Sequence, residues 1–110
     1  MRIHSRRRVA TITLAIAGAF APAAMAQITT SGDVAPPVGP GNTDFGAVIL
    51  FVGNTATGSV SVVNGATPTG DSVFLGETVT GNGTMTVNGI GSQVTVNNGF
   101  RVGRNGTGLL

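Results

Sequence analysis

The sequence predicts an all-β chain, with most of its length in a β-solenoid whose short strands stack coil upon coil. Three observations support this fold class. Residues 59–62, 84–87 and 93–96 alternate polar and apolar side chains, which is the pattern of strands with one buried face. Glycine and asparagine separate these runs, and the 18 glycines of the chain disfavour helices. An approximate repeat of about 25 residues then groups the strands into coils.

Residues 1–26 form a predicted signal peptide. Four arginines lie within the first eight residues, and residues 9–21 are uncharged and mostly small or apolar. Ala24 and Ala26 then make an A-x-A site, so we expect cleavage before Gln27. The alternative is a membrane anchor, but the apolar run is shorter than the roughly 20 residues that a bilayer span requires.

Removal of this segment changes the charge of the chain. Two arginines and four acids remain, so the net charge becomes 2 − 4 = −2. Such a chain cannot neutralise many phosphates, and we expect no nucleic-acid partner. We expect contact with a membrane only through the signal peptide or through an anchor outside this sequence.

The missing residue types restrict the chemistry further. The sequence contains no cysteine and no lysine, and its single histidine, His4, lies in the signal peptide. A Ser-His-Asp or Cys-His nucleophile, a zinc site with histidine or thiolate ligands, and a Schiff base are therefore excluded. We expect no enzyme activity, no catalytic residue, no cofactor and no metal.

Residues 27–46 form a predicted leader rich in proline and glycine. Pro36, Pro37 and Pro40 forbid a helix and disfavour a central strand, so we expect an extended or partly ordered segment. Asp33 and Asp44 lie in this leader and are interpreted as solvated loop acids.

Residues 47–110 contain the repeat. An apolar residue followed by glycine ends a run at positions 52–53, 75–76 and 102–103, with steps of 75 − 52 = 23 and 102 − 75 = 27 residues. VGNTATGSV (52–60) also aligns without gaps to VGRNGTGLL (102–110), with identical residues at four of nine positions. A period of this length with short strands fits coils whose equivalent strands pair in parallel.

The alternation predicts which side chains face inward. The expected inward residues are Leu50, Val52, Val60, Val62, Val73, Leu75, Met85, Val87, Val94, Val96, Phe100 and Val102. Phe51, Phe74 and Arg101 are expected in one column on the outer face, although a register slip of one residue would exchange the two faces.

An antiparallel meander is the alternative fold. Asn-Gly pairs begin at positions 64, 82, 88, 98 and 105, and Asn-Gly is the favoured two-residue hairpin turn. A hairpin does not require recurrence every 25 residues, however, and both residue types tolerate the positive φ that solenoid corners need. The repeat therefore favours the solenoid.

Nine glycines are predicted to turn the corners of the coils. They are Gly53, Gly58, Gly76, Gly81, Gly83, Gly89, Gly91, Gly103 and Gly108. A dinucleotide-binding interpretation of residues 81–83 fails because Thr86 occupies the position of the third glycine and a strand follows. Asp71 and Glu77 could form a glycosidase pair, but we interpret them as solvated loop acids because no other acid lies in the repeat region.

The repeat resembles one shared by autotransporter (type V secretion) and PEP-CTERM proteins. The resembling segments are VGNTATGSVSVVNG and LGETVTGNGTMTVNGIGSQVTVNNGFRVGRNGTG, where residues 89–92 match a G-x-G-S element. It covers about residues 28–110. Gln93 stands where an aromatic residue usually follows, and Ala56 and Ser59 depart from the first Gly-x-Gly.

The resemblance implies a right-handed parallel β-helix passenger, exported to the cell surface or outer membrane of a Gram-negative bacterium or secreted. It implies a structural or presenting role, with possible adhesion to a host or matrix surface ligand. A PEP-CTERM-type exported repeat protein and a fragment of a polysaccharide-active β-helix enzyme are the alternatives. Because a new coil begins just before Leu110, we expect an N-terminal piece of about two coils from a longer protein, with a downstream β-barrel translocator. We also expect residues 27–110 alone to be marginally stable or prone to aggregation.

Overall fold

The computed structural model describes residues 25–39 and 44–110, and all regular structure in these ranges is β-strand. The predicted signal peptide, apart from its last two residues, lies outside the described residues. Within the described ranges, no helix has the length and apolar character needed to cross a membrane.

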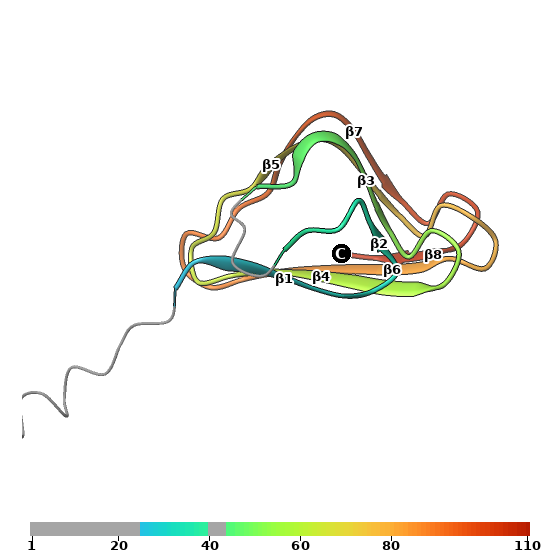
Figure 1. Ribbon diagram of the computed structural model, residues 1–110, viewed down its shortest axis with the longest axis horizontal. Helices are drawn as coiled ribbons and strands as arrows, with labels where there is room; N and C mark the ends of the chain where they lie inside the picture. Colours follow the sequence, from blue (N-terminus) through green and yellow to red (C-terminus); the bar gives the residue numbers. More distant parts are fainter. Residues whose placement is uncertain (1–24, 40–43) are drawn as a thin grey trace, which may run out of the picture.

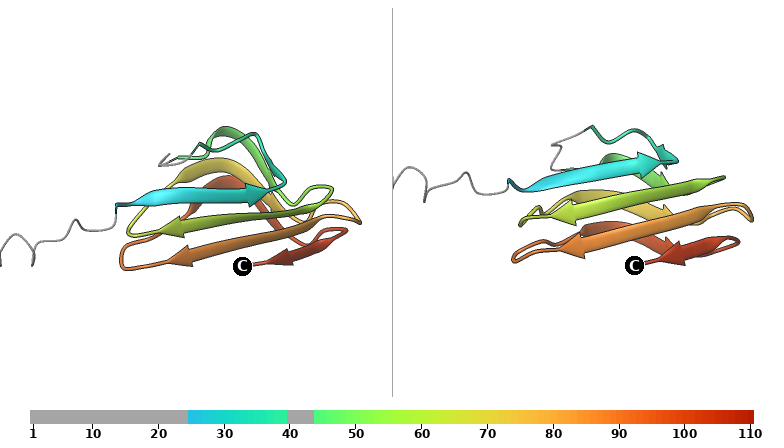
Figure 2. Two further views of the ribbon diagram at one scale, coloured as in Figure 1. Left: turned by 60° about the horizontal axis from the view of Figure 1, so that its bottom comes forward. Right: turned by 90° about the horizontal axis from the view of Figure 1, so that it is seen from below.

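Eight strands form two four-stranded sheets (Figure 1). Their bounds are β1 Gln27–Gly32, β2 Val34–Ala35, β3 Gly46–Val52, β4 Thr57–Val63, β5 Thr69–Leu75, β6 Asn82–Asn88, β7 Thr95–Val102 and β8 Thr107–Leu109. One sheet has the order β1-β4-β6-β8 and the other has the order β2-β3-β5-β7. From β4 onward, each strand therefore lies in the sheet opposite to the strand before it. Figure 2 shows the resulting levels stacked one below another.

The pairing within each sheet is parallel from β3 onward. β3 pairs with β5 and β5 with β7, while β4 pairs with β6 and β6 with β8. The antiparallel meander is therefore wrong. Asn64 and Gly65 do form a turn with positive φ, but it joins β4 to β5, which lie in different sheets. The Asn-Gly pairs at 82 and 98 lie inside strands.

The parallel register aligns the apolar residues in columns. Leu50, Val73 and Phe100 occupy equivalent positions in β3, β5 and β7. The predicted inward residues of the first levels are buried, namely Leu50, Val52, Val60, Val62, Val73, Leu75 and Met85. Val94 and Val96 are partly buried against this core. The core thus lies between the two sheets. Burial of its apolar side chains is the main favourable term in folding.

Three predicted inward residues are exposed instead. Val87, Phe100 and Val102 have exposed fractions of 40%, 37% and 45%. They stand in register with buried residues of the preceding level, but no strand in the described part of the chain covers β7 or the second half of β6. Alternation predicts the direction of a side chain, whereas burial also requires a neighbouring level.

The leader is part of the fold. β1 pairs antiparallel with β4, and β2 pairs antiparallel with β3, so the chain reverses direction at its first level. Ile28, Val38 and Phe45 are buried in the common core. These contacts close the N-terminal end of the stack. The prolines of this segment led us to expect an extended or partly ordered leader instead.

Candidate functional site

The corner that joins the β3-β5-β7 sheet to the β4-β6-β8 sheet is built on a column of glycines. Gly58, Gly83 and Gly108 pair in register across β4, β6 and β8. A β-carbon on each would lie 2.7, 2.7 and 2.5 Å, respectively, from the backbone nitrogen of the glycine that begins the same corner. The sequence predicted turn glycines at these positions, but the structure places them inside strands. Space for a crossing backbone, and not positive φ, explains them.

The same corner begins with a second glycine column. Gly53, Gly76 and Gly103 have φ values of 66°, 67° and 66°, in the left-handed region that disfavours other residues. The nitrogen of Gly76 donates to the carbonyl oxygen of Val52, and the nitrogen of Gly103 donates to that of Leu75. Each corner is thereby hydrogen-bonded to the end of the strand one level earlier.

A third position shows how the first corner differs. Gly81 and Gly106 precede β6 and β8, and a β-carbon on either would overlap carbonyl oxygens of the preceding corner. Ala56 precedes β4 in the same way. At this first corner the neighbouring group is Asp33 instead of an earlier corner. Its Oδ2 accepts hydrogen bonds from the nitrogens of Thr55 at 2.8 Å and Ala56 at 3.1 Å.

Asp33 is partly exposed, as the sequence suggested, but it is not a free loop acid, because hydrogen bonds fix its carboxylate to the first corner. The hydrogen bond from the Thr55 nitrogen, followed by that from the Ala56 nitrogen, lowers the pKa of its carboxyl below the ordinary value of 3.8. The backbone oxygen of Asp33 also accepts a hydrogen bond from the Gly53 nitrogen at 2.6 Å. Asp33 thus supplies the contacts that a preceding corner would make.

The opposite corner contains the G-x-G-S element. Gly89 and Gly91 both have positive φ, as a tight turn requires. Ser92 Oγ accepts a hydrogen bond from the Gly65 nitrogen at 2.9 Å and donates to the carbonyl oxygen of Asn88 at 2.7 Å. One hydroxyl thereby links two successive corners.

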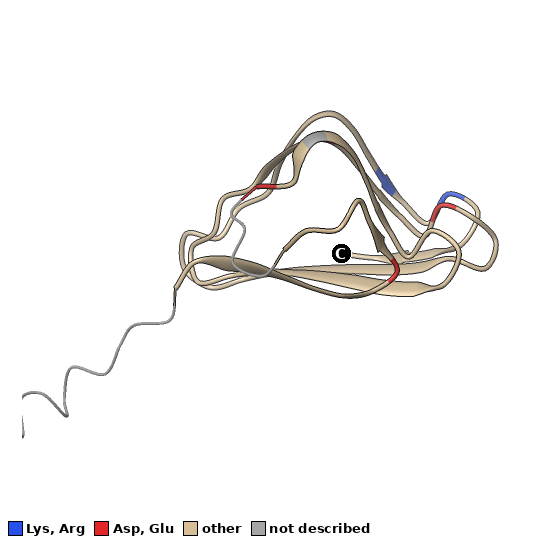
Figure 3. Cartoon of the chain, viewed as in Figure 1, with Lys and Arg blue, Asp and Glu red and all other residues tan. Residues whose placement is uncertain are grey.

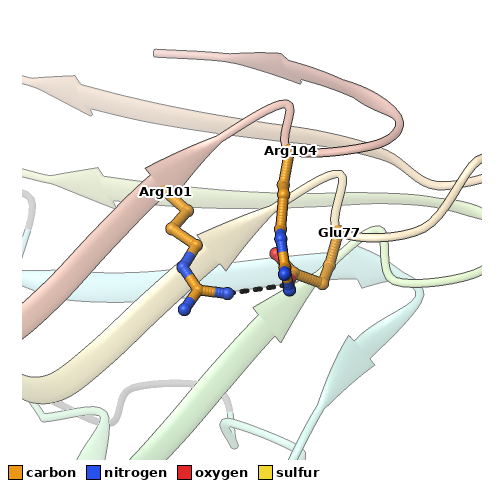
Figure 4. Close-up of polar contacts among 3 residues, drawn as sticks. All are labelled: Glu77, Arg101 and Arg104. Carbon is orange, nitrogen blue, oxygen red and sulfur yellow. Dashed lines mark hydrogen bonds and ion pairs between the residues drawn. The ribbon is translucent and has the colours of Figure 1, made fainter.

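Glu77 joins two arginines on the outside of the stack (Figure 4). Its Oε1 lies 2.9 Å from Nη1 of Arg101 and 2.9 Å from Nη1 of Arg104. The Glu77 side chain is only 12% exposed, so it is not a solvated loop acid. Its Oε2 is buried and has no hydrogen-bond partner among the described residues.

The predicted outer column is confirmed. Phe51 pairs with Phe74, and Phe74 pairs with Arg101, across β3, β5 and β7. The two rings pack edge to face with centroids 5.6 Å apart, and the Arg101 guanidinium lies 4.2 Å from the centroid of the Phe74 ring. The Phe74 ring therefore lies between the Phe51 ring and the Arg101 guanidinium, and its contact with the guanidinium has cation–π geometry.

The acidic residues fall at separate places along the described chain (Figure 3), although Asp44 and Asp71 line one small pocket together with Thr69 and Asn97. Asp71 accepts hydrogen bonds from Ser72 Oγ and Asn98 Nδ2, whereas Asp44 Oδ1 accepts from the nitrogens of Phe45 and Thr69. Asp71 and Glu77 therefore contact separate partners, without the shared arrangement that a glycosidase pair needs. No group of three or more metal-ligating side chains occurs in the part of the chain that the structure describes.

The corner contacts of Glu77 and Ser92 were not identified from the sequence. The contact of Ser92 with Gly65 and those of Glu77 with Arg101 and Arg104 connect residues 24 to 27 positions apart. That separation is close to the repeat length, so the repeat is the feature of the sequence that could have indicated these contacts.

Comparison with protein-family models, with curated proteins and with solved structures finds no match. The fold itself defines the class, which is an all-β chain whose strands pair in two stacked sheets.

Proposed function

We propose that residues 46–109 are a segment of a right-handed parallel β-helix. The parallel pairing of equivalent strands and the recurring corner glycines support this architecture. The stack of three levels is the arrangement expected of a solenoid, in which each level contacts only its neighbours.

The function we infer is that of an exported, non-catalytic segment of an autotransporter-like passenger, which spaces or presents other parts at the cell surface. One observation carries this proposal. The corner built on Gly58 is repeated at Gly83 and again at Gly108 with the same backbone contact. A unit whose close contact between two glycines recurs at each level suits an extendable stalk, and polar side chains such as Glu77 and Ser92 serve contacts between levels.

Adhesion is the second candidate, and the outer face of β3 favours it. Ile49 is 40% exposed and lies two residues before Phe51, on the same face of β3 as the column of Phe51 and Phe74, and the preceding Val48 is 47% exposed. Exposed apolar residues beside an aromatic pair are a feature of surfaces that bind other macromolecules. A PEP-CTERM-type repeat protein and a polysaccharide-active fragment have no comparable observation in their favour.

The test is to fuse the full 110-residue chain to a β-barrel translocator and express it in a Gram-negative bacterium. We expect an N-terminus at Gln27, removal of the chain by protease added to intact cells, and no hydrolysis of polysaccharides. A variant with Ala24→Glu and Ala26→Glu is the control for signal cleavage. Retention of the wild-type chain inside the cell would overturn the proposal. Adhesion of displaying cells to matrix, abolished by Ile49→Glu, would select the adhesive form over the spacer.

A further inference from the structure

The β1-β4-β6-β8 sheet presents one whole face to the outside of the stack. Side chains alternate between the two faces of a strand. Ile28, Val60, Val62 and Met85 are buried in the core, so the residues between them point outward. The outward side chains of β1, β4 and β6 include six hydroxyl groups, which belong to Thr29, Ser31, Ser59, Ser61, Thr84 and Thr86.

These six hydroxyl groups form a regular array. The register of the strands sorts them into two columns of three, which are Thr29-Ser61-Thr86 and Ser31-Ser59-Thr84. Neighbouring strands of a sheet lie about 4.8 Å apart, and alternate residues of one strand lie about 6.7 Å apart. The hydroxyl groups therefore lie near the points of a rectangular lattice with these two spacings.

The sheet that carries the array is flat. In Figure 1, β1, β4, β6 and β8 overlap along one nearly straight line, and Figure 2 shows the same strands side by side. Most sheets twist, whereas a flat sheet keeps the side chains of one face in a plane. Because this face points sideways from the stack, further levels at either end would leave it exposed.

The face carries no charge. β1, β4, β6 and β8 contain no acidic or basic residue, and the charged residues of the described chain lie outside these strands (Figure 3). Within residues 25–39 and 44–110, none of the six hydroxyl groups makes a hydrogen bond to another residue. Thr78 and Thr80, at a corner, differ in that they donate to carbonyl oxygens of the preceding level. The hydroxyl groups of the face are thus available to water or to a ligand.

A flat, uncharged array of this kind is complementary to an ordered lattice of water. Oxygen atoms at the surface of hexagonal ice repeat at distances close to both spacings of the array. A protein partner would require an apolar centre in the interface, and a sugar is usually bound against aromatic side chains. The two hydroxyl columns contain no apolar side chain, and the four strands contain no aromatic residue. We propose that the outer face of β1, β4 and β6 binds ice, through water molecules that the two columns hold at lattice positions.

The test is the growth of ice crystals in a frozen sucrose solution that contains the purified 110-residue chain. We expect the wild type to slow recrystallisation and to become enriched in a slowly grown ice crystal. Ser61→Arg should lose both effects, because a long charged side chain then stands within the array. Thr67→Arg is the matched control, since it adds the same charge at an exposed residue outside the strands, and it should keep both effects. Ser61→Thr, which retains the hydroxyl group, should also keep them.

Circular dichroism checks that each protein has the wild-type fold. Three results would overturn the proposal. The first is a folded wild type that neither slows recrystallisation nor enters ice, and the second is an equal loss in Ser61→Arg and Thr67→Arg. The third is binding of the wild type to insoluble cellulose, abolished by Ser61→Arg, without any effect on ice, which would assign the face to a neutral polysaccharide. The inference goes beyond the proposed function and does not depend on it, since it concerns one face of the fold.

Discussion

Gly83 has no room for a β-carbon, because one built there would lie 2.7 Å from the backbone nitrogen of Gly76. The Gly76 nitrogen is fixed in place by its hydrogen bond to the Val52 carbonyl. The two glycines therefore determine together how closely one level turns against the next.

Gly83→Ala should lower the free energy of unfolding by about 3 kcal/mol, because backbone atoms must move to admit the methyl group. Chemical denaturation of the mature chain followed by circular dichroism measures this loss. Gly99→Ala is the matched control, since its β-carbon would find its nearest neighbours at 3.6 Å. Equal effects of the two substitutions would contradict the role assigned to the column.

Glu77→Gln should destabilise the chain by about 1 kcal/mol, because it removes the charge shared by Arg101 and Arg104 while keeping the size of the side chain. The loss should shrink in high salt, which screens charges near the surface. Arg104→Gln is the comparison, and it should cost less because Arg101 keeps its partner. The measurement is denaturation at two salt concentrations, and a loss insensitive to salt would argue against an electrostatic origin.

Asp33 should make the fold sensitive to acid. Its carboxyl accepts backbone hydrogen bonds in the folded state, which hold its pKa below the ordinary value of 3.8. The stabilisation is thus fully present above that value, and it is lost as the pH falls through the lower folded pKa. Thermal unfolding from neutral pH down to the acid range should show a smaller decrease in Tm for Asp33→Ala than for the wild type. Parallel curves for the two proteins would refute this linkage.

Ser92→Ala should destabilise the chain by about 1 kcal/mol, because two hydrogen bonds are lost and the half-buried nitrogen of Gly65 is left without a partner. Thr86→Ala is a suitable control, since Thr86 is exposed on β6. Denaturant midpoints of the two variants give the comparison. If both variants unfold with the wild-type midpoint, the hydroxyl does not secure the corner.

Phe100→Lys should reduce self-association of the mature chain. Phe100 is 37% exposed on β7, which has no partner on its outer side in the described residues. Lysine on an exposed strand discourages pairing with other molecules. Size-exclusion chromatography with light scattering over a range of concentrations should show aggregates for the wild type and fewer for the variant. A wild type that stays monomeric and melts cooperatively would show that the open edge is harmless.

The sequence predicted the strands and their inward faces where lateral contacts decide the structure. Leu50, Val73 and the outer pair of Phe51 and Phe74 follow from alternation combined with the repeat. The exposure of Val102 could not be predicted in this way. It depends on whether another level covers the strand, and not on the alternation of inward and outward side chains.

The contacts of the candidate site were less accessible to sequence reasoning. The approach of Gly83 to Gly76 requires knowledge of how two levels cross, and the ion pairs of Glu77 require the register between corners. The antiparallel pairing of β1 was missed because Ile28 lies in a segment dominated by prolines, where a strand pattern is short. A single strand of six residues carries little periodic signal.

The reversal of chain direction at β1 gives the molecule a polarity that bears on how it can change in evolution. β1 and β2 pair antiparallel with the first level, and Asp33 seals the corner above Ala56. A tandem duplication of one 25-residue unit downstream of β4 would reproduce its own glycine contacts and lengthen the stack. The same duplication upstream would separate Asp33 from its corner. Variation in length is thus permitted by this architecture on one side only.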